Sequence, residues 1–309
     1  MTKIIMKKTL LFEEAFSRFI VSKKCEGLAE KTIRSYEGHL RCMGKYLDIQ
    51  MPMSSFQKEQ ADEMIQKMQS ANLSANSIAS YVRTLKSFLS WCSEEGISDV
   101  KIPKYKTEET VKEVYTDEEL LKLLRKPNLQ KCAFTEYRDW VIINFLISTG
   151  CRAATLRAIQ VRDIDFENHF VYYRHTKNGK AQIMPLCTQM QSILQEYLYF
   201  REGEETDPLF CTEDGEALSE NAVKLAVARY NKRRGVSKTS THLFRHTFAT
   251  KYLLDCGGDA FTLQRLLGHS TLEMTKHYCR ISNKDIAASF NNISPLEQLK
   301  PASKKIRIK

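Results

Sequence analysis

The sequence predicts a mainly α-helical protein with one small antiparallel β-sheet, organised as an N-terminal helical bundle and a larger C-terminal domain. Apolar residues recur every three or four positions over most of the chain, which is the helical period. The period changes near residues 170–186, where two strand-like runs flank an Asn-Gly pair, a strong signal for a β-hairpin. A length of 309 residues favours two domains over one.

Residues 1–100 are predicted to form a bundle of about four helices. The first covers roughly 10–24 and the third roughly 58–70. The second helix has an apolar stripe with steps of three and four residues, formed by Ile33, Tyr36, Leu40, Met43 and Leu47. The fourth has a similar stripe from Ile78 to Cys92, with Ser74 as its N-cap and Gly96 as its stop.

Two of these helices also carry basic residues away from the apolar stripes. They are Arg34, Arg41 and Lys45 on the second helix and Arg83 and Lys86 on the fourth. A single basic face is commonly a solvated surface, but two such faces in one small bundle favour contact with DNA. These side chains are therefore candidate DNA-binding residues.

A polar, lysine-rich stretch around Pro103 predicts an extended linker over 101–112. The C-terminal domain opens with a capping box from Thr116 to Glu119, which starts a helix that ends before Pro127. The almost uniformly apolar segment 134–149 predicts a buried helix that ends at Gly150. A short helix over 152–159 follows.

The β-hairpin is predicted from the runs Phe170–Tyr173 and Ile183–Leu186, which flank Asn178-Gly179. Lys177 precedes that turn and is expected at the tip of the sheet. From 187 onward the pattern is helical again. Near the C-terminus, Ser294-Pro295 and a capping-box acid predict a short helix that stops before Pro301.

Composition narrows the classes of function. The net charge of +10 and the pI near 9.0 favour a polyanionic partner, with nucleic acid first. The nine cysteines are scattered without zinc-ligand spacing, which is typical of reduced thiols in a cytoplasmic protein. The N-terminus lacks a signal-peptide core, and no apolar run is long enough to span a bilayer. No GxxxxGK[ST] or HExxH motif occurs in the sequence.

One ordered set of motifs carries phosphate chemistry. A guanidinium can bind two phosphate oxygens, an imidazole can donate or accept a proton, and a phenol can act as a nucleophile. Each residue alone has an ordinary interpretation, such as a solvated charge, a hairpin-tip lysine (with Lys180 as a competitor) or a core tyrosine. The set is Thr149-Gly150-Cys151-Arg152, Lys177, His242-x-x-Arg245, Leu267-Gly268-His269 and Tyr278.

Together these motifs resemble the tyrosine recombinase family, also called phage-type integrases, and most closely its two-domain Xer-like or transposon-type members. The resemblance covers nearly the whole chain. It implies a helical core-binding domain over 1–100, a linker over 101–112 and an α+β catalytic domain over 113–292. It also implies a docking segment and basic tail over 293–309, with docking in cis or in trans left open.

The resemblance implies a site-specific DNA recombinase that cleaves and rejoins DNA through a 3′-phosphotyrosyl intermediate and a Holliday junction, without metal or ATP. The implied partner is double-stranded DNA with inverted-repeat half-sites. The enzyme is expected as a homotetramer on DNA and as a monomer or weak oligomer in solution, with accessory proteins as further candidates. Two other classes stay open, which are a type IB topoisomerase and a catalytically silent DNA-binding protein.

The family also implies a role for each matched residue. Arg152 and Arg245 clamp the scissile phosphate, Lys177 protonates the leaving 5′-hydroxyl, and Tyr278 is the nucleophile. His242 and His269 match the phosphate-side histidines. The chain departs from the family pattern at Thr155, where the family has Glu or Asp three residues after the first arginine. How Arg152 is held is therefore open.

Overall fold

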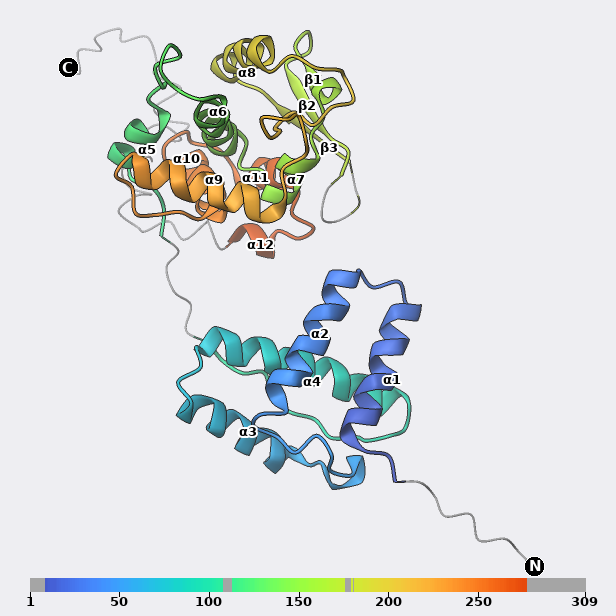
Figure 1. Ribbon diagram of the computed structural model, residues 1–309. Coiled ribbons are helices and arrows are strands. Elements are labelled where there is room, and N and C mark those ends of the chain that lie inside the picture. The colour runs from blue at the N-terminus through green and yellow to red at the C-terminus, as the bar shows by residue number, and fades with distance from the viewer. Residues whose placement is uncertain (1–8, 108–112, 176–178, 180, 277–309) are drawn as a thin grey trace, which may run out of the picture. The chain divides into compact units, whose positions relative to one another are not determined.

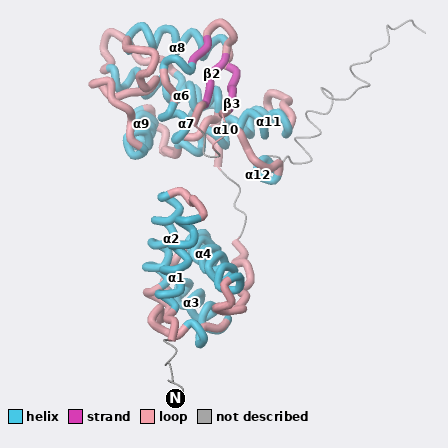
Figure 2. The backbone as a smooth tube through the Cα atoms, turned by 90° about the vertical axis from the view of Figure 1, so that its right-hand side faces the viewer, coloured by secondary structure: helices cyan, strands magenta, loops and turns pink. Residues whose placement is uncertain are grey.

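A computed structural model describes residues 9–107, 113–175, 179 and 181–276. The chain divides into two compact units between residues 110 and 111, and each unit has its own hydrophobic core (Figure 1). Helices predominate in both units, and one small antiparallel sheet lies in the C-terminal unit (Figure 2). The predicted fold class is confirmed. Within the described ranges, no helix combines the length and apolar character needed to cross a bilayer.

The N-terminal unit contains four α-helices among its described residues, as predicted from apolar spacing. They are α1 (Phe12–Cys25), α2 (Glu30–Met43), α3 (Lys58–Ser70) and α4 (Ala75–Glu94), with a 3₁₀ turn at Met53–Ser55. The predicted cap of α4 is confirmed, since Ser74 Oγ accepts a hydrogen bond from the Ser77 backbone N–H at 3.2 Å. Gly96 follows the helix with φ +65°. The stripes on α2 and α4 face the hydrophobic core of this unit, which includes Phe88. The ring centroids of Phe88 and Phe16 lie 4.9 Å apart.

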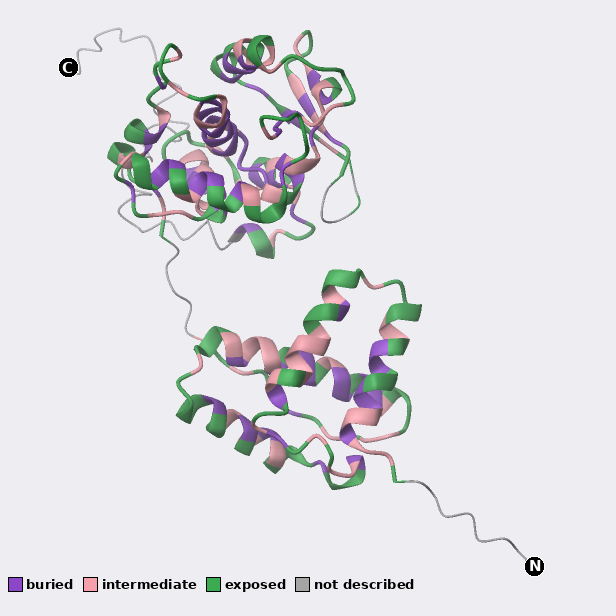
Figure 3. Ribbon diagram, in the orientation of Figure 1, coloured by how far each residue is buried: buried purple, intermediate pink, exposed green. Residues whose placement is uncertain are grey.

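The C-terminal unit is built around one buried helix, α6 (Phe134–Thr149), which packs against α5, α8, α9 and α10 (Figure 3). The predicted capping box is present, because Thr116 and Glu119 exchange hydrogen bonds at the start of α5. Helices also follow the sheet, where the sequence predicted a helical pattern from residue 187 onward. The elements are α5 (Asp117–Leu124), α7 (Ala153–Ala158), α8 (Thr188–Arg201), α9 (Glu220–Arg233), α10 (Thr241–Leu254), α11 (Ala260–Leu267) and α12 (Glu273–Lys276).

The antiparallel sheet has the strand order β1 (Ile164–Asp165), β2 (Phe170–Tyr173) and β3 (Gln182–Pro185). The hairpin of β2 and β3 was predicted, but its register differs from the one that the Asn-Gly pair indicates. A two-residue turn at 178–179 would pair Tyr173 with Met184, whereas Tyr173 pairs with Gln182. A shift of two residues keeps each side chain on its face of the sheet, so Val171 and Met184 remain buried. The turn residue Asn178 lies outside the described residues, as does the predicted C-terminal helix.

Gly150 ends α6 in a left-handed conformation with φ +60°, and an added Cβ would lie 2.5 Å from Cδ1 of Phe248. We expect Gly150→Ala to lower the free energy of unfolding by about 2–4 kcal/mol, from left-handed strain and overpacking together. Denaturant unfolding of the full chain would measure this. The matched control is Gly235→Ala, because Gly235 has φ +72° and open space around its Cβ position. The control should lose only about 1 kcal/mol, and equal losses would contradict the packing explanation.

Candidate active site

The best-defined part of the candidate site is the guanidinium of Arg245, which lies on α10 and is only 6% exposed. Its Nη1 donates to the carbonyl oxygen of Gly150 at 3.0 Å, and its Nη2 donates to that of Leu267 at 2.8 Å. Nη2 also lies 2.8 Å from Nε2 of His269. These three partners carry no negative charge, so these contacts position the guanidinium without cancelling its positive charge.

The contact with Arg245 determines the protonation state of His269. Arginine has only donors, so Nε2 of the imidazole must accept this hydrogen bond. The ring proton of the neutral form then lies on Nδ1, which is 2.9 Å from Oγ1 of Thr275 and can donate to it. The geometry therefore selects a neutral His269 with a single tautomer, held between Arg245 and Thr275.

The segments that lead to Arg152 and His269 both begin at a glycine that ends a helix. Gly150 ends α6 and Gly268 ends α11, each in the left-handed conformation, with φ +60° and +61°. In each case a carbonyl at or just before the glycine accepts from Arg245. Arg245 therefore joins the ends of two helices that are more than a hundred residues apart in the sequence.

Arg152 lies two residues after Gly150, at the N-cap of α7, and is half-buried. Between them, Cys151 is buried. Burial raises the pKa of its thiol to about 11, although the positive charge of Arg245 works in the opposite direction. The thiol is therefore protonated at neutral pH. Thr155, at the position where the family has an acid, is also buried, with 5% exposure.

His242 lies in the first turn of α10, one turn before Arg245. A separation of three residues on a helix would place both side chains on one face, but His242 is exposed whereas Arg245 is buried. The N-terminal end of a helix carries partial positive charge, which suits a phosphate near His242. Lys177 and Tyr278 lie outside the described residues. Of the described candidates, the structure brings Arg245 and His269 into contact and places the turn before Arg152 against Arg245.

The five candidate DNA-binding residues of the N-terminal unit are all exposed. They are Arg34, Arg41, Lys45, Arg83 and Lys86. Arg34 also forms an exposed ion pair with Glu30, with 3.2 Å between Nε and Oε1. Nδ1 of His39 on α2 lies 2.6 Å from Oγ1 of Thr84 on α4, which fixes the two helices next to each other. Burial and the nearby Arg83 both lower the pKa of His39.

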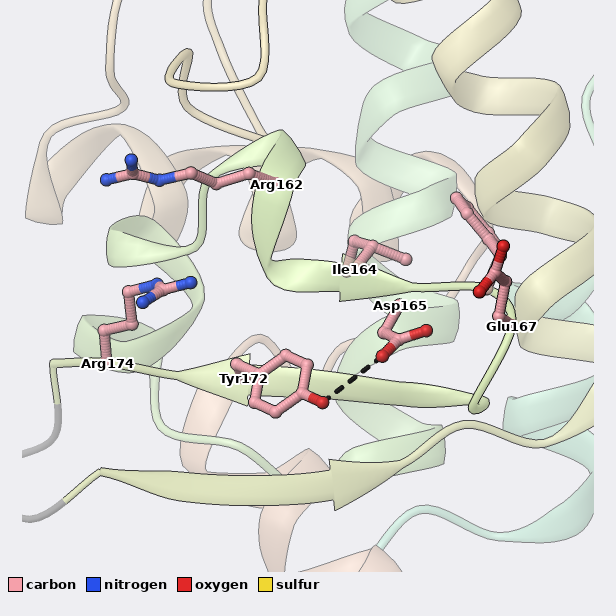
Figure 4. A pocket seen from close by; sticks show the side chains of 7 residues that line it. Arg162, Ile164, Asp165, Glu167, Tyr172 and Arg174 are labelled. Atoms are coloured by element: carbon pink, nitrogen blue, oxygen red, sulfur yellow. Dashed lines mark hydrogen bonds between the residues drawn. The ribbon is translucent and has the colours of Figure 1, made fainter.

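A hollow of about 630 Å³ lies on the sheet, away from these candidates (Figure 4). Several polar side chains that line it form hydrogen bonds with other protein groups. The Tyr172 hydroxyl donates to Oδ2 of Asp165 at 3.2 Å, and Nε of Arg174 lies 2.5 Å from Oδ1 of the buried Asp163. None of the described candidate catalytic residues lines it, and we assign it no role in the reaction.

Sequence reasoning missed the groups that position these candidates. Thr275, the carbonyls of Gly150 and Leu267, and the side chain of Gln182, which binds the end of α11, had no recognisable signal. Hydrogen bonds to main-chain carbonyls depend on tertiary placement, and many residue types can make them.

Family models match most of the chain. The model of the phage integrase family matches residues 113–285, and that of the phage integrase N-terminal SAM-like domain matches residues 15–96. The chain is 29% identical over 296 residues to the tyrosine recombinase XerD of Staphylococcus haemolyticus, covering 91% of this chain and 98% of the relative. It is also 29% identical over 301 residues to the tyrosine recombinase XerA of Pyrococcus furiosus, covering 95% of this chain and 99% of that relative.

Solved structures share the fold. The integrase of the Tn1549 transposon, in complex with transposon right-end DNA, has a TM-score of 0.73 at 20% identity, covering 92% of this chain and 99% of that one. Lambda integrase, solved as a tetramer bound to a Holliday junction, has a TM-score of 0.72 at 19% identity, covering 88% of this chain and 78% of that one.

Proposed function

The chain belongs to the phage integrase family, and from this premise we propose how its own residues carry out strand transfer. It is a tyrosine recombinase, an enzyme for site-specific DNA recombination that cleaves and rejoins DNA through a 3′-phosphotyrosyl intermediate and a Holliday junction.

In the proposed reaction, the guanidiniums of Arg152 and Arg245 bind the non-bridging oxygens of the scissile phosphate. The Tyr278 oxygen attacks phosphorus as its proton passes to solvent water. The bond to the 5′-oxygen breaks as a 3′-phosphotyrosyl bond forms, and Lys177 donates a proton to the departing 5′-oxygen. His242 assists at the phosphate, and His269 acts there through its contact with the guanidinium of Arg245. Reversal with a new 5′-hydroxyl restores the phosphodiester, so the step needs neither metal nor ATP.

One observation carries this proposal: a buried guanidinium holds together the two helix ends that lead to Arg152 and His269. Negative charge develops on the phosphate oxygens in the transition state, and cations already held in place stabilise it without reorganisation. The phenol has an ordinary pKa of about 10, so attack at neutral pH benefits from nearby cations.

The assembly is part of the same proposal. The N-terminal domain (1–100) and the catalytic domain (113–292), joined by the linker 101–112, would bind inverted-repeat half-sites of double-stranded DNA. Because a solved relative is a tetramer on a Holliday junction, we propose a homotetramer on DNA that is monomeric or weakly associated in solution. Residues 293–309 would form a docking segment, in cis or in trans.

The test is formation of a covalent protein–DNA adduct. Duplexes that the protein binds would be selected from a randomised pool, and the half-site obtained would be rebuilt as a nicked suicide substrate that traps the cleaved state. The expected result is an adduct that survives denaturation, with the modified peptide containing Tyr278. Failure to form any adduct with a tightly bound half-site would favour a silent DNA-binding protein. Relaxation of supercoiled DNA without recombinant products would favour a topoisomerase.

The role of the N-terminal basic residues predicts a change in the salt dependence of binding. Removing both Arg83 and Lys86 by alanine substitution should reduce the slope of log affinity against log salt by about 1 per lost phosphate contact. Fluorescence anisotropy over a salt series would measure it. The matched control replaces Lys58 and Lys67 on α3, which are about as exposed and remove the same charge from the same unit. Equal slopes for both double variants would contradict a specific role for α4.

A further inference from the structure

The side-chain amide of Gln182 closes the C-terminal end of α11. Its Nε2 lies 3.0 Å from the carbonyl oxygen of Arg265 and 2.6 Å from that of Leu266. The next carbonyl, that of Leu267, accepts from Arg245. Carbonyls in the last turn of a helix lack N–H donors within the helix, so side-chain donors there fix the helix end. Two residues from different elements therefore hold three successive carbonyls immediately before His269.

Gly268 provides the space for this amide. An ideal Cβ on Gly268 would lie 2.5 Å from Oε1 of Gln182, and its φ of +61° already disfavours other residues. The glycine of the Leu-Gly-His motif in this chain thus serves two purposes. It ends α11, and it lets the Gln182 side chain lie directly against the backbone that leads to His269.

Gln182 also belongs to the last residue pair between β2 and β3 before the hairpin connection. It pairs with Tyr173 across β2 and β3, and residues 174–181 connect them, including Lys177. Tyr173 is buried, and the side chains of Thr149 and Cys151 lie near enough to its hydroxyl to influence its pKa, which burial raises. The hydroxyl makes no hydrogen bond of ordinary geometry with the described residues. The pair Tyr173 and Gln182 therefore contacts the turn before Arg152 on one side and the end of α11 on the other.

We propose that Gln182 is a positioning residue for strand transfer: its amide ties the base of the loop that carries Lys177 to the helix end that carries His269. This inference rests on the proposed function, in which Lys177 protonates the leaving oxygen. Without the amide, the end of α11 keeps its contact with Arg245, whereas the sheet loses these two hydrogen bonds to α11. The defect should therefore appear in proton donation to the leaving group more than in phosphate binding.

The experiment compares two leaving groups in single-turnover cleavage of the suicide substrate. One substrate has the natural 5′-oxygen, and the other has a bridging 5′-sulfur, which leaves as a thiolate without needing a proton. Gln182→Met keeps the approximate side-chain volume and removes both donors. We expect it to cleave the oxygen substrate about 10- to 100-fold more slowly than the parent, as small displacements of catalytic groups do. It should cleave the sulfur substrate within about 3-fold of the parent, corresponding to less than 1 kcal/mol of barrier.

Three further variants make the result decisive. Gln182→Glu places an acceptor-only carboxylate against the same carbonyls and should behave like Gln182→Met. Ile183→Ala, at the neighbouring and 56% exposed position of β3, should cleave both substrates normally. Lys177→Ala should be slow with oxygen and restored with sulfur.

The outcomes separate the two proposals. If Lys177→Ala is restored by sulfur and the Gln182 variants are normal, or are slowed equally on both substrates, the positioning role is overturned and the proposed function stands. Loss of folding in both Gln182 variants would make the residue structural and also overturn the inference. If Lys177→Ala is not restored, its role as the acid fails, and the inference fails with it.

Discussion

Tyr278→Phe is expected to abolish the covalent protein–DNA adduct completely while leaving affinity for the half-site within about 3-fold, or less than 1 kcal/mol. Phenylalanine keeps the ring and removes only the oxygen that would form the bond to phosphorus. No neighbouring group replaces it, because a phosphotyrosyl link needs a phenolic oxygen. The measurement pairs an adduct assay on the suicide substrate with binding anisotropy for the same DNA.

The matched control for this prediction is Tyr199→Phe. Tyr199 lies on α8 and is 78% exposed, so loss of its hydroxyl should change neither binding nor adduct yield. An adduct that persists in Tyr278→Phe would assign the nucleophile to another residue, and mass mapping of the modified peptide would identify it. That result would undo the mechanism proposed for this chain and leave its family membership intact.

Local chemistry made much of the fold predictable from sequence. The cap at Ser74, the capping box at Thr116 and the glycine after α6 are each set by a few neighbouring residues, and each appears where it was expected. The apolar stripes of α2 and α4 were equally clear, because the helical period repeats over several turns.

The features that the sequence did not predict depend on distant contacts. The strand Ile164–Asp165 is too short to show alternation, and it exists because it pairs with β2. The hairpin register follows from which side chains fill the core, rather than from the Asn-Gly pair alone. In the site, the motif order predicted Arg245 and His269 as candidates, but their direct contact and the hydrogen bond from His269 to Thr275 required the folded chain.

Arg245→Lys is expected to reduce the rate of strand cleavage by at least about 10³-fold, or about 4 kcal/mol of transition-state stabilisation. Lysine keeps the charge, so general attraction to DNA should persist and half-site affinity should stay within about 3-fold. However, a single ammonium nitrogen cannot reproduce the fixed directions in which two guanidinium nitrogens reach Gly150, Leu267 and His269. The phosphate would then meet a mobile point charge instead of a fixed planar donor.

Arg245→Ala gives a less direct test, because it also leaves two buried carbonyls without their donor, at about 1–3 kcal/mol each. The control for Arg245→Lys is Arg201→Lys. Arg201 has a buried side chain, with 3% exposure, and its guanidinium donates to the Pro208 carbonyl through Nε and Nη2 at 3.1 and 2.7 Å. Both variants should lose stability, but only Arg245→Lys should lose cleavage per folded molecule. Equal cleavage rates would show that Arg245 holds the fold together and takes no part in binding the scissile phosphate.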